Sequence, residues 1–505
     1  MRNLVLERLG KFDFPAVLIL ALLMRLVGIN SRPLWYDEAF AVLFSERGPG
    51  AMYYGTLAQT GGISADIHPL AYYLALFGWI KTFGDSPVAV RLLSIAFGMG
   101  VILIAYGLGK LLVDHSTGMW IALLTAISPF QIHYAQEIRM YAMLTFFLLL
   151  ACVAFWKGAK GGKPAWWLLF AVSAALAQYT HNLAAIFLLP LAATPLAFKP
   201  VRNSLRNVIL AGLGALLLYL PWVLLLPGQL AKVQRSYWIS PPDFSRLLTT
   251  ILSFTTNLPI PVGWLPLALL ASLLTLFIAI FQTVKAIRKG GTYLQPGVWM
   301  AYMALTPVVL LFIISRFYPV YIERALLPSG VLYLAWVAWS LANTRLLRPV
   351  QYFVLVILAL GMGMGYIQHL TYQGFPYAAY TDLARELRAQ SGAGDLILHS
   401  NKLTMLPTVY YDRTLPQEYL TDPPGSGSDT LALPTQEALG LMALPSVESI
   451  GTSKVRVWFV IFQRAIKEYQ GLGYETHPHL AWLNEHYSLE RIETWGDLLV
   501  YVYKR

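Results

Sequence analysis

Long runs of apolar residues, separated by short polar segments, fill the chain up to about residue 371. Runs of roughly 17–25 apolar residues match the hydrocarbon thickness of a membrane, so about eleven runs, several of them short, predict membrane-spanning helices. The first run lacks a small-residue cleavage site and therefore predicts a retained helix rather than a removed signal peptide. The predicted spans are Phe14–Ile29, Val88–Val113, Gly118–Phe130, Gln136–Trp156, Ala165–Tyr179, Leu183–Phe198, Val208–Leu226, Val262–Val284, Val298–Ile314, Ala325–Leu341 and Tyr352–Leu370.

Basic residues cluster beside alternate connections of these spans. The clusters are Arg2, Arg8 and Lys11; Lys157, Lys160 and Lys163; Lys199, Arg202 and Arg206; Lys285, Arg288 and Lys289; and Arg345 and Arg348. With about eleven spans they all fall on one side, which the positive-inside rule predicts to be the cytoplasm. The N-terminus is therefore predicted to be cytoplasmic, and the tail from Thr371 onward lies outside.

The outer side carries the long polar segments Asn30–Pro87 and Pro227–Pro261 and the tail. Within the first of these, Pro69–Phe83 predicts an amphipathic helix in the membrane interface. In the tail, helical and strand patterns alternate, which favours a small α/β domain. The predicted elements are the helices Tyr380–Gln390 and Ala465–Gly471, the strands Asp395–His399, Lys454–Phe462 and Leu498–Tyr503, and the loop Asp422–Asp429.

We therefore predict an α-helical polytopic membrane protein with two domains. Residues 1–371 form the transmembrane domain, which includes a catalytic first outer loop at 30–87, and residues 372–505 form an extracytoplasmic α/β domain. The predicted location is the cytoplasmic membrane of the cell, with the active site facing outside.

Composition supports this fold class. Hydrophobic residues make up 57% of the chain, charged residues only 12%, and the mean hydropathy is +0.56. Soluble domains carry about 25% charged residues, so a soluble enzyme and a disordered chain are both excluded. The net charge of +11 (37 − 26) is explained by the cytoplasmic clusters rather than by nucleic acid. Cys152 is the only cysteine, which excludes an intrachain disulfide.

Acids, histidines and arginines gather at the predicted outer ends of the spans. Each has a structural explanation when taken alone: Asp37 and Glu38 as solvated loop acids, Arg25 as a residue that extends its charge to the interface, and Glu137 as an acid at a helix N-terminus. His133 lies four residues before Glu137, so the two side chains would share one face of a helix. Their accumulation on one membrane face favours function, because ionisable groups beside spans are costly.

Such a set of residues suits a phosphorylated lipid. Guanidinium groups offer planar paired donors to phosphate. A carboxylate in the same cavity can accept the proton of an attacking hydroxyl, and fixed arginines stabilise the charge on a departing phosphate. The pattern predicts transfer of a sugar from a polyprenyl-phosphate donor at the outer face.

The motifs that carry these residues resemble those of integral-membrane C-type (GT-C) glycosyltransferases, in particular relatives of protein O-mannosyltransferases and of lipid A aminoarabinose transferases. The matching segments are Leu34–Ala39 (LWYDEA), His68–Tyr73 (HPLAYY), Ala89–Leu92 (AVRL), Ser128–Tyr141 (SPFQIHYAQEIRMY), Tyr179–His181 (YTH) and Glu323–Pro328 (ERALLP). The resemblance extends to about Leu341. Two segments depart from the usual pattern, with Leu70 in place of a second proline and Ala325 in place of tyrosine.

The resemblance implies that Asp37 is the catalytic base or a ligand of the acceptor. Together with the arginines, it favours Asp37 as the base of an inverting displacement. It implies that Arg324 contacts the donor phosphate, and that Arg91 and Arg139 are additional contacts. Arg316 lies at the same predicted membrane face and is the fourth predicted phosphate-binding residue. Substrate contacts are predicted for Tyr36, Glu38, His68, Gln136, Glu137, Tyr141 and His181. No cofactor is certain. The candidate ligands for a divalent cation are Asp37 and Glu137, because the acid that Glu137 matches helps to bind such a cation in some relatives.

The acceptor stays open between a lipid, a glycan such as lipopolysaccharide, and a protein, and the sugar between hexose, pentose and aminosugar. The main alternative from another class is a transporter or flippase for a lipid-linked solute, which internal repeats and midplane charges would favour. A membrane scaffold and a lipid-linked oligosaccharide ligase are the remaining alternatives.

Overall fold

The computed structural model describes residues 14–236, 239–288, 296–342, 347–423, 426, 428–450 and 454–505. Within these residues the chain divides into two compact units. Unit 1 comprises residues up to Ile29, Arg91–Leu224 and Ile239–Thr371, and unit 2 comprises Asn30–Val90, Leu225–Trp238 and Tyr372–Arg505. The first outer loop was predicted to belong with the spans, but by its contacts it groups with the tail. The basic residues Arg2, Arg8, Lys11, Lys289 and Arg345 lie outside the described residues.

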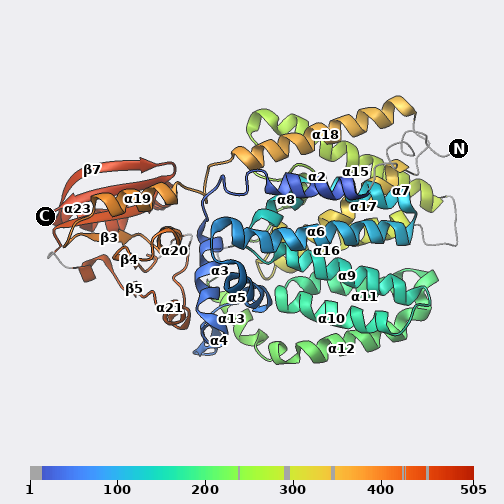
Figure 1. Ribbon diagram of the computed structural model, residues 1–505, viewed down its shortest axis with the longest axis horizontal. Coiled ribbons are helices and arrows are strands. Elements are labelled where there is room, and N and C mark those ends of the chain that lie inside the picture. Colours follow the sequence, from blue (N-terminus) through green and yellow to red (C-terminus); the bar gives the residue numbers. More distant parts are fainter. Residues whose placement is uncertain are drawn as a thin grey trace. The chain divides into compact units, whose positions relative to one another are not determined.

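Unit 1 is a bundle of helices that run alongside one another (Figure 1). Every predicted span corresponds to a helix. The helices of unit 1 are α2 (Phe14–Leu26), α6 (Pro87–Leu112), α7 (His115–Ile127), α8 (Pro129–Gln136), α9 (Tyr141–Ala159), α10 (Ala165–Thr180), α11 (Ala184–Ala197), α12 (Leu205–Val223), α14 (Ser245–Thr256), α15 (Leu265–Arg288), α16 (Pro296–Ser315), α17 (Leu327–Ala342) and α18 (Arg348–Thr371).

Seven of the described helical segments are long and apolar enough to cross a membrane, and α2, α10 and α11 are shorter apolar helices. α7 has 13 residues, as many as its predicted span, but it begins and ends three residues earlier, because Ser128 and Pro129 start a new helix after it. Burial differs widely among the long helices: α17 is 94% buried inside the structure, whereas the segment containing α12 is 22% buried. α17 is therefore central, and α12 exposes leucines on its surface, as a helix that faces lipid would.

Unit 2 contains the first outer loop, folded into helices rather than extended chain. α3 (Tyr36–Glu46) and α4 (Gly48–Leu57) lead to a short hairpin, β1 (Gln59–Thr60) and β2 (Ile63–Ser64). α5 (Ala71–Phe83) follows and matches the predicted amphipathic segment, and α13 (Leu226–Ser236) comes from the second outer segment.

The tail forms the predicted α/β domain around a six-stranded sheet in the order β5-β4-β3-β6-β8-β7. β5, β4, β3 and β6 are parallel, and β8 and β7 are antiparallel to their neighbours. The strands are β3 (Leu396–His399), β4 (Gln417–Leu420), β5 (Ala443–Leu444), β6 (Arg456–Phe462), β7 (Ser488–Trp495) and β8 (Leu498–Lys504). The helices are α19 (Tyr380–Gln390), α20 (Lys402–Tyr411), α21 (Leu433–Leu439), α22 (Gln463–Gly471) and α23 (Pro478–His486).

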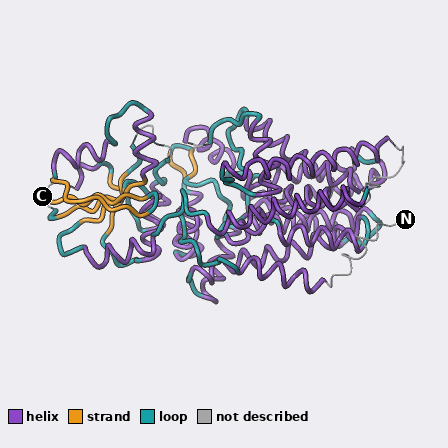
Figure 2. Tube along the Cα trace, turned by 90° about the horizontal axis from the view of Figure 1, so that it is seen from above, coloured by secondary structure: helices purple, strands orange, loops and turns teal. Residues whose placement is uncertain are grey.

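Helices cover both faces of this sheet (Figure 2). Along β6, Trp458 and Val460 belong to one hydrophobic cluster with Leu383 of α19, whereas Phe459 belongs to a second cluster with Leu483 of α23. Successive residues of β6 therefore pack into two separate hydrophobic cores, one on each face of the sheet. Both faces of the strand are buried, which explains why its sequence is a continuous apolar run.

Candidate active site

In unit 2, the predicted acids Asp37 and Glu38 lie in the first turn of α3. Trp35 precedes the helix in an extended conformation, and its backbone N–H donates to Glu38 Oε2 at 3.4 Å. Glu38 is only 1% exposed, so its carboxylate caps the helix from inside. Asp37 is partly exposed, and its position at the N-terminus of the helix favours a negative charge. Of the two acids, Asp37 is therefore the more exposed.

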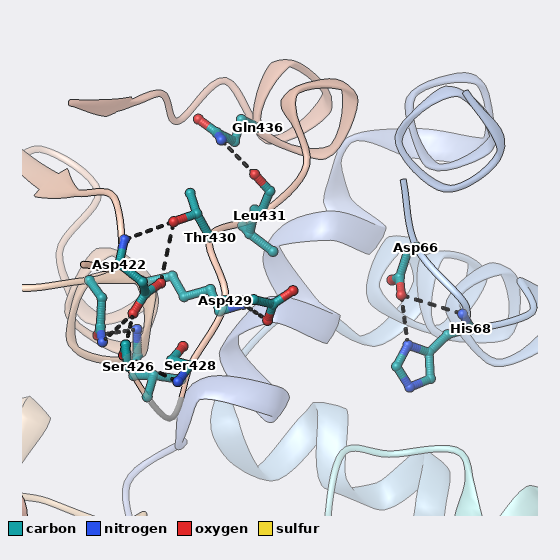
Figure 3. A network of polar contacts seen from close by, with 12 residues as sticks. Asp66, His68, Asp422, Ser426, Ser428, Asp429, Thr430, Leu431 and Gln436 are labelled. Carbon is teal, nitrogen blue, oxygen red and sulfur yellow. Dashed lines mark hydrogen bonds and ion pairs between the residues drawn. The ribbon is translucent and has the colours of Figure 1, made fainter. Parts of the chain in front are cut away.

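His68 is held by a residue that the sequence did not single out as a site residue, Asp66. Asp66 Oδ1 lies 2.9 Å from His68 Nδ1 and also accepts the backbone N–H groups of Ile67 at 2.6 Å and His68 at 3.4 Å (Figure 3). Burial alone would raise the pKa of the Asp66 carboxyl, but His68, Lys232 and the Ile67 amide hold it well below its usual range. An ionised Asp66 therefore orients the imidazole of His68, a pairing that the spacing Asp-Ile-His could have suggested.

In unit 1, the segment Ser128–Tyr141 forms a broken helix. α8 ends at Gln136, Glu137 is extended, and α9 begins at Tyr141. The expected shared helix face of His133 and Glu137 is therefore wrong, because the helix ends before Glu137. Glu137 and Arg139 are 5% and 3% exposed, and such buried charges are costly unless they are compensated.

Gln136 joins helix ends from three parts of unit 1. Its side-chain amide donates to the carbonyl oxygens of Arg25 at 2.7 Å and Val27 at 2.9 Å. Because both of these groups are acceptors, its Oε1 is the atom that faces His369, and His369 Nε2 donates to it at 2.7 Å. The predicted substrate-binding residue Gln136 thus also ties α2 and α18 to the end of α8.

Arg25 does not extend to the membrane interface, as its position had suggested. It is 1% exposed, and its guanidinium donates to the carbonyl oxygens of Ala126 at 3.0 Å and Thr125 at 3.3 Å. These carbonyl oxygens belong to the last turn of α7, where backbone acceptors have no partner within the helix. Arg25 is therefore a helix-capping residue, and the interpretation as an interfacial side chain is wrong.

Arg324, Tyr141 and His181 form a contiguous group within unit 1. The guanidinium carbon of Arg324 lies 5.2 Å from the ring centroid of Tyr141, and the rings of Tyr141 and His181 are 5.9 Å apart. His181 Nδ1 accepts the backbone N–H of Leu183 at 3.1 Å. The neutral imidazole therefore carries its proton on Nε2, so that His181 presents a donor to an anion or a hydroxyl group.

The other predicted arginines have different surroundings. Arg91 is 4% exposed and donates to the carbonyl oxygen of Ile29 at 2.6 Å. Arg316 is exposed and donates to the carbonyl oxygen of Pro242 at 2.9 Å, so it does not share the buried setting of Arg91 and Arg139.

A small apolar cavity lies beside the Arg324 group. Its volume is about 10 Å³, which is room for about one water molecule. Its walls come from residues that follow His181 and Arg324 in the chain and from α16. The lining residues are Leu183, Ile186, Phe187, Pro307, Leu311, Ala325, Leu326 and Ser329.

Asn257 is a second residue that the sequence missed. Its φ of 62° with ψ of 177° is a backbone conformation that belongs almost entirely to glycine. Its side-chain Nδ2 lies 3.1 Å from His133 Nδ1, and the His133 ring stacks on Tyr134 with centroids 4.6 Å apart. A positive φ leaves no signal in a hydropathy pattern, and so nothing in the sequence marked this position.

The part of the chain that the structure describes contains no group of three or more His, Cys, Asp or Glu residues that could hold a metal ion. The two candidate ligands, Asp37 and Glu137, belong to different units.

One part of the chain matches a known protein family. Residues 67–225 match the family described as dolichyl-phosphate-mannose-protein mannosyltransferase. No curated protein matches the chain. The matched residues include the His68, Ser128–Tyr141 and His181 segments.

The fold is shared over nearly the whole chain with a solved membrane enzyme. ArnT from Cupriavidus metallidurans in the apo state is 12% identical, with a TM-score of 0.61 and coverage of 96% of this chain and 97% of that one. ArnT bound to undecaprenyl phosphate gives 12% identity, a TM-score of 0.59 and the same coverage. The oligosaccharyltransferase of Archaeoglobus fulgidus, in complex with Zn and sulfate, gives 12% identity and a TM-score of 0.52, over 95% of this chain and 73% of that one. The chain therefore has the fold of ArnT and, over residues 67–225, resembles the mannosyltransferase family, as the sequence motifs predicted. Together with its long apolar helices, this indicates a multi-pass membrane protein.

Proposed function

We propose that this protein is a membrane glycosyltransferase that moves a sugar from a polyprenyl-phosphate donor to an acceptor hydroxyl. The observation that carries the proposal is the group of Arg324, Tyr141 and His181, in a chain with the fold of ArnT. Ala325 and Leu326, which follow Arg324 in the chain, line a small apolar cavity. ArnT has been solved with undecaprenyl phosphate bound. A cation next to an apolar cavity is the combination that a phosphate with a long hydrocarbon tail requires.

The donor phosphate is bound by arginine in this proposal. Arg324 contributes its guanidinium, and the Nε2–H of His181 donates to a phosphate oxygen or a sugar hydroxyl. Arg91 and Arg139, which are buried in the same unit, add positive charge. The apolar side chains of Ile186, Phe187 and Leu311 offer the first isoprenoid groups a contact surface.

Asp37 acts as the base. The acceptor oxygen attacks the anomeric carbon while its proton passes to the Asp37 carboxylate. The bond between the anomeric carbon and the phosphate oxygen breaks, its electron pair stays on the polyprenyl phosphate, and the configuration inverts. Arg324 stabilises the charge that develops on this leaving group. The reaction requires Asp37 and Arg324 to reach the same substrate molecule.

The active site faces the extracytoplasmic side of the cytoplasmic membrane in this proposal. The basic clusters of the sequence support this orientation through the positive-inside rule. Nucleotide sugars are absent on that side, which explains the use of a lipid-linked donor. Lipids, glycans and proteins remain candidates for the acceptor.

The test is radiolabel transfer in reconstituted vesicles, with polyprenyl-phosphate sugars supplied one at a time together with an extract of host lipids and proteins. Asp37→Asn is the test variant, and Glu38→Gln is its matched control, because Glu38 is buried and caps α3. We expect labelled product with the wild type and with Glu38→Gln at a reduced rate, and none with Asp37→Asn. Full activity of Asp37→Asn would overturn its role as the base. Movement of labelled lipid across the bilayer without consumption of donor would replace the transferase by a flippase.

A further inference from the structure

Several residues of segment 32–36, just before Asp37, contact side chains of the C-terminal domain. The guanidinium carbon of Arg32 lies 4.5 Å from the ring centroid of Tyr377, and the Trp35 ring contacts the same tyrosine at 6.4 Å. The backbone N–H of Leu34 donates to Tyr411 Oη at 2.9 Å. All of these residues belong to unit 2, although more than 340 positions separate the partners along the chain.

Lys402 contacts Tyr36, the residue that precedes Asp37 in the chain. It is the first residue of α20, it is 6% exposed, and its Nζ lies 5.4 Å from the ring centroid of Tyr36. On its other side, Nζ forms an ion pair with Asp429 Oδ1 at 3.0 Å. A lysine is rarely so buried unless its charge is compensated, and here a carboxylate and an aromatic face compensate it together.

Asp422 and Thr430, on either side of Asp429 in the chain, take part in hydrogen bonds. Asn401 Nδ2 donates to Asp422 Oδ1 at 3.0 Å, and the backbone N–H of Asp422 donates to Thr430 Oγ1 at 2.8 Å (Figure 3). Asp429, which pairs with Lys402, therefore lies between two hydrogen-bonded residues of the chain.

This network lies at the carboxyl end of β3, where α20 begins. β3 pairs with β4 on one side and with β6 on the other, so its end is the point at which the order of the parallel strands reverses. Open α/β sheets commonly bind their ligands at this point. Here the same place holds Lys402, and Lys402 contacts the start of α3.

We propose that the C-terminal α/β domain is a positioning part of the catalytic site, with Lys402 as its positioning residue. Through Tyr36, Leu34 and Trp35, the domain fixes the direction of the first turn of α3 and so of the Asp37 carboxylate. A displacement of about 1 Å at a reacting group can cost a large part of the rate, even when the altered residue does not touch the substrate. This inference rests on the proposed function, in which Asp37 is the base.

The test combines steady-state kinetics with hydrogen–deuterium exchange on the full-length protein. Lys402→Met removes the charge but keeps the length of the side chain, and Tyr411→Phe deletes the single oxygen that accepts from Leu34. Arg464→Met is the matched control, because Arg464 makes the same kind of contact with Phe375, at 4.7 Å, and no ion pair or hydrogen bond of the described residues ties it to segment 32–38. Lys402→Arg tests rescue by a retained cation.

We expect Lys402→Met to lower kcat about tenfold with KM for the donor within about twofold, and to speed amide exchange in residues 34–40. Tyr411→Phe should give a smaller effect of the same kind, about threefold in kcat, without disturbing the fold. Lys402→Arg should recover more than half of the wild-type kcat, and Arg464→Met should match the wild type in both measurements.

Unchanged exchange in residues 34–40 for both Lys402→Met and Tyr411→Phe would overturn the inference, whatever the activity. Faster exchange with an unchanged kcat would overturn it as well, because the segment would then be held without consequence for catalysis. If the wild type transfers no sugar from any donor, the proposed function fails, whereas faster exchange in the two variants would still support the domain's hold on segment 32–38.

Discussion

Segments 30–68 and 128–141 both carry candidate acids at a helix end, but different parts of the chain hold them. In unit 2, the residues before Asp37 contact side chains of the C-terminal domain. In unit 1, Gln136 binds the end of α2 and His369 of α18, so the segment before Glu137 is tied into the helix bundle itself. The acid in unit 2 thus depends on a folded α/β domain, whereas the acid in unit 1 depends on helices that lie in the membrane.

This difference separates two kinds of polar residue that the sequence could not tell apart. Arg25, Gln136 and Glu38 each satisfy backbone groups at a helix end, so their first effect is on structure. Arg324 has an aromatic neighbour and an apolar cavity beside it, and Asp37 is partly exposed. Replacing residues of the first kind should reduce stability, and replacing residues of the second kind should reduce the rate.

After Asp37→Asn, the largest effect is expected from Arg324→Met. Loss of the cation that stabilises the leaving phosphate should lower kcat/KM for the donor by roughly 10²–10³-fold, while stability changes little. The measurement is radiolabel transfer at several donor concentrations.

The neighbouring Glu323→Gln is the control for Arg324→Met. Glu323 forms an ion pair with Arg246 at 2.9 Å, and the Arg246 side chain is 44% exposed. Exposed pairs of this kind contribute about 0–1 kcal/mol, so activity should stay within about threefold of the wild type. Equal losses in the two variants would contradict a specific role for Arg324.

Gln136→Leu should act on stability before it acts on rate. The substitution removes the donor to the carbonyl oxygens of Arg25 and Val27 and the acceptor for His369, which should destabilise unit 1 by about 2–3 kcal/mol. Thermal unfolding in detergent measures this as a lower Tm. A large fall in kcat with an unchanged Tm would instead assign Gln136 to the substrate.

Much of this architecture could be predicted from hydrophobic patterns. Each predicted span is a helix, and α19, β3, β6, α22 and β8 lie where the tail pattern placed them. These elements are long, apolar or periodic, so local sequence determines them. α20 was missed, since Pro407 and the mixed residues around it show no clear period. α20 is nevertheless the helix that carries Lys402 and Tyr411.

The candidate site could be predicted only as a set of residue types. Asp37 was singled out because charges beside spans are costly, and that reasoning needs no partner. Arg324 was singled out by the resemblance of the segment Glu323–Pro328. The contacts of Lys402 with Tyr36, and of Asn257 with His133, join residues far apart in the chain or depend on a backbone angle. Neither is encoded in a local pattern.

Acid should weaken the C-terminal domain. Burial lowers the pKa of His399 to about 4, from an ordinary value of 6.5, and burial likewise lowers the pKa of His477 to about 4. Between pH 6.5 and pH 4 the unfolded chain binds more protons than the folded domain, so stability falls as pH falls. For the fully buried His399 the loss is about 2 kcal/mol between pH 7 and pH 5.

Amide exchange in β3 and β6, corrected for the intrinsic pH dependence, measures the loss of stability in acid. His399→Gln keeps a polar side chain beside Thr404 and Gln417 but cannot take up a proton in this range. It should flatten the pH dependence, and His477 should retain part of it. The same slope in the wild type and the variant would show that His399 does not cause the loss.

The smallest change in stability and rate is expected at Asn257. Two substitutions there distinguish the energetic cost of the strained backbone from the contribution of the side-chain contact. At a φ of 62° glycine is relaxed and alanine is strained, so Asn257→Ala should be less stable than Asn257→Gly by about 1 kcal/mol, seen as a lower Tm. Both variants lose the amide that contacts His133, so both should lower kcat by the same few-fold factor if that contact orients His133. If kcat instead follows the Tm, with the glycine variant close to the wild type, then the shape of the backbone after α14 matters and the amide does not. Equal Tm values for the two variants would mean that the turn relaxes when the side chain is removed, and the strained φ would then depend on the hydrogen bond to His133.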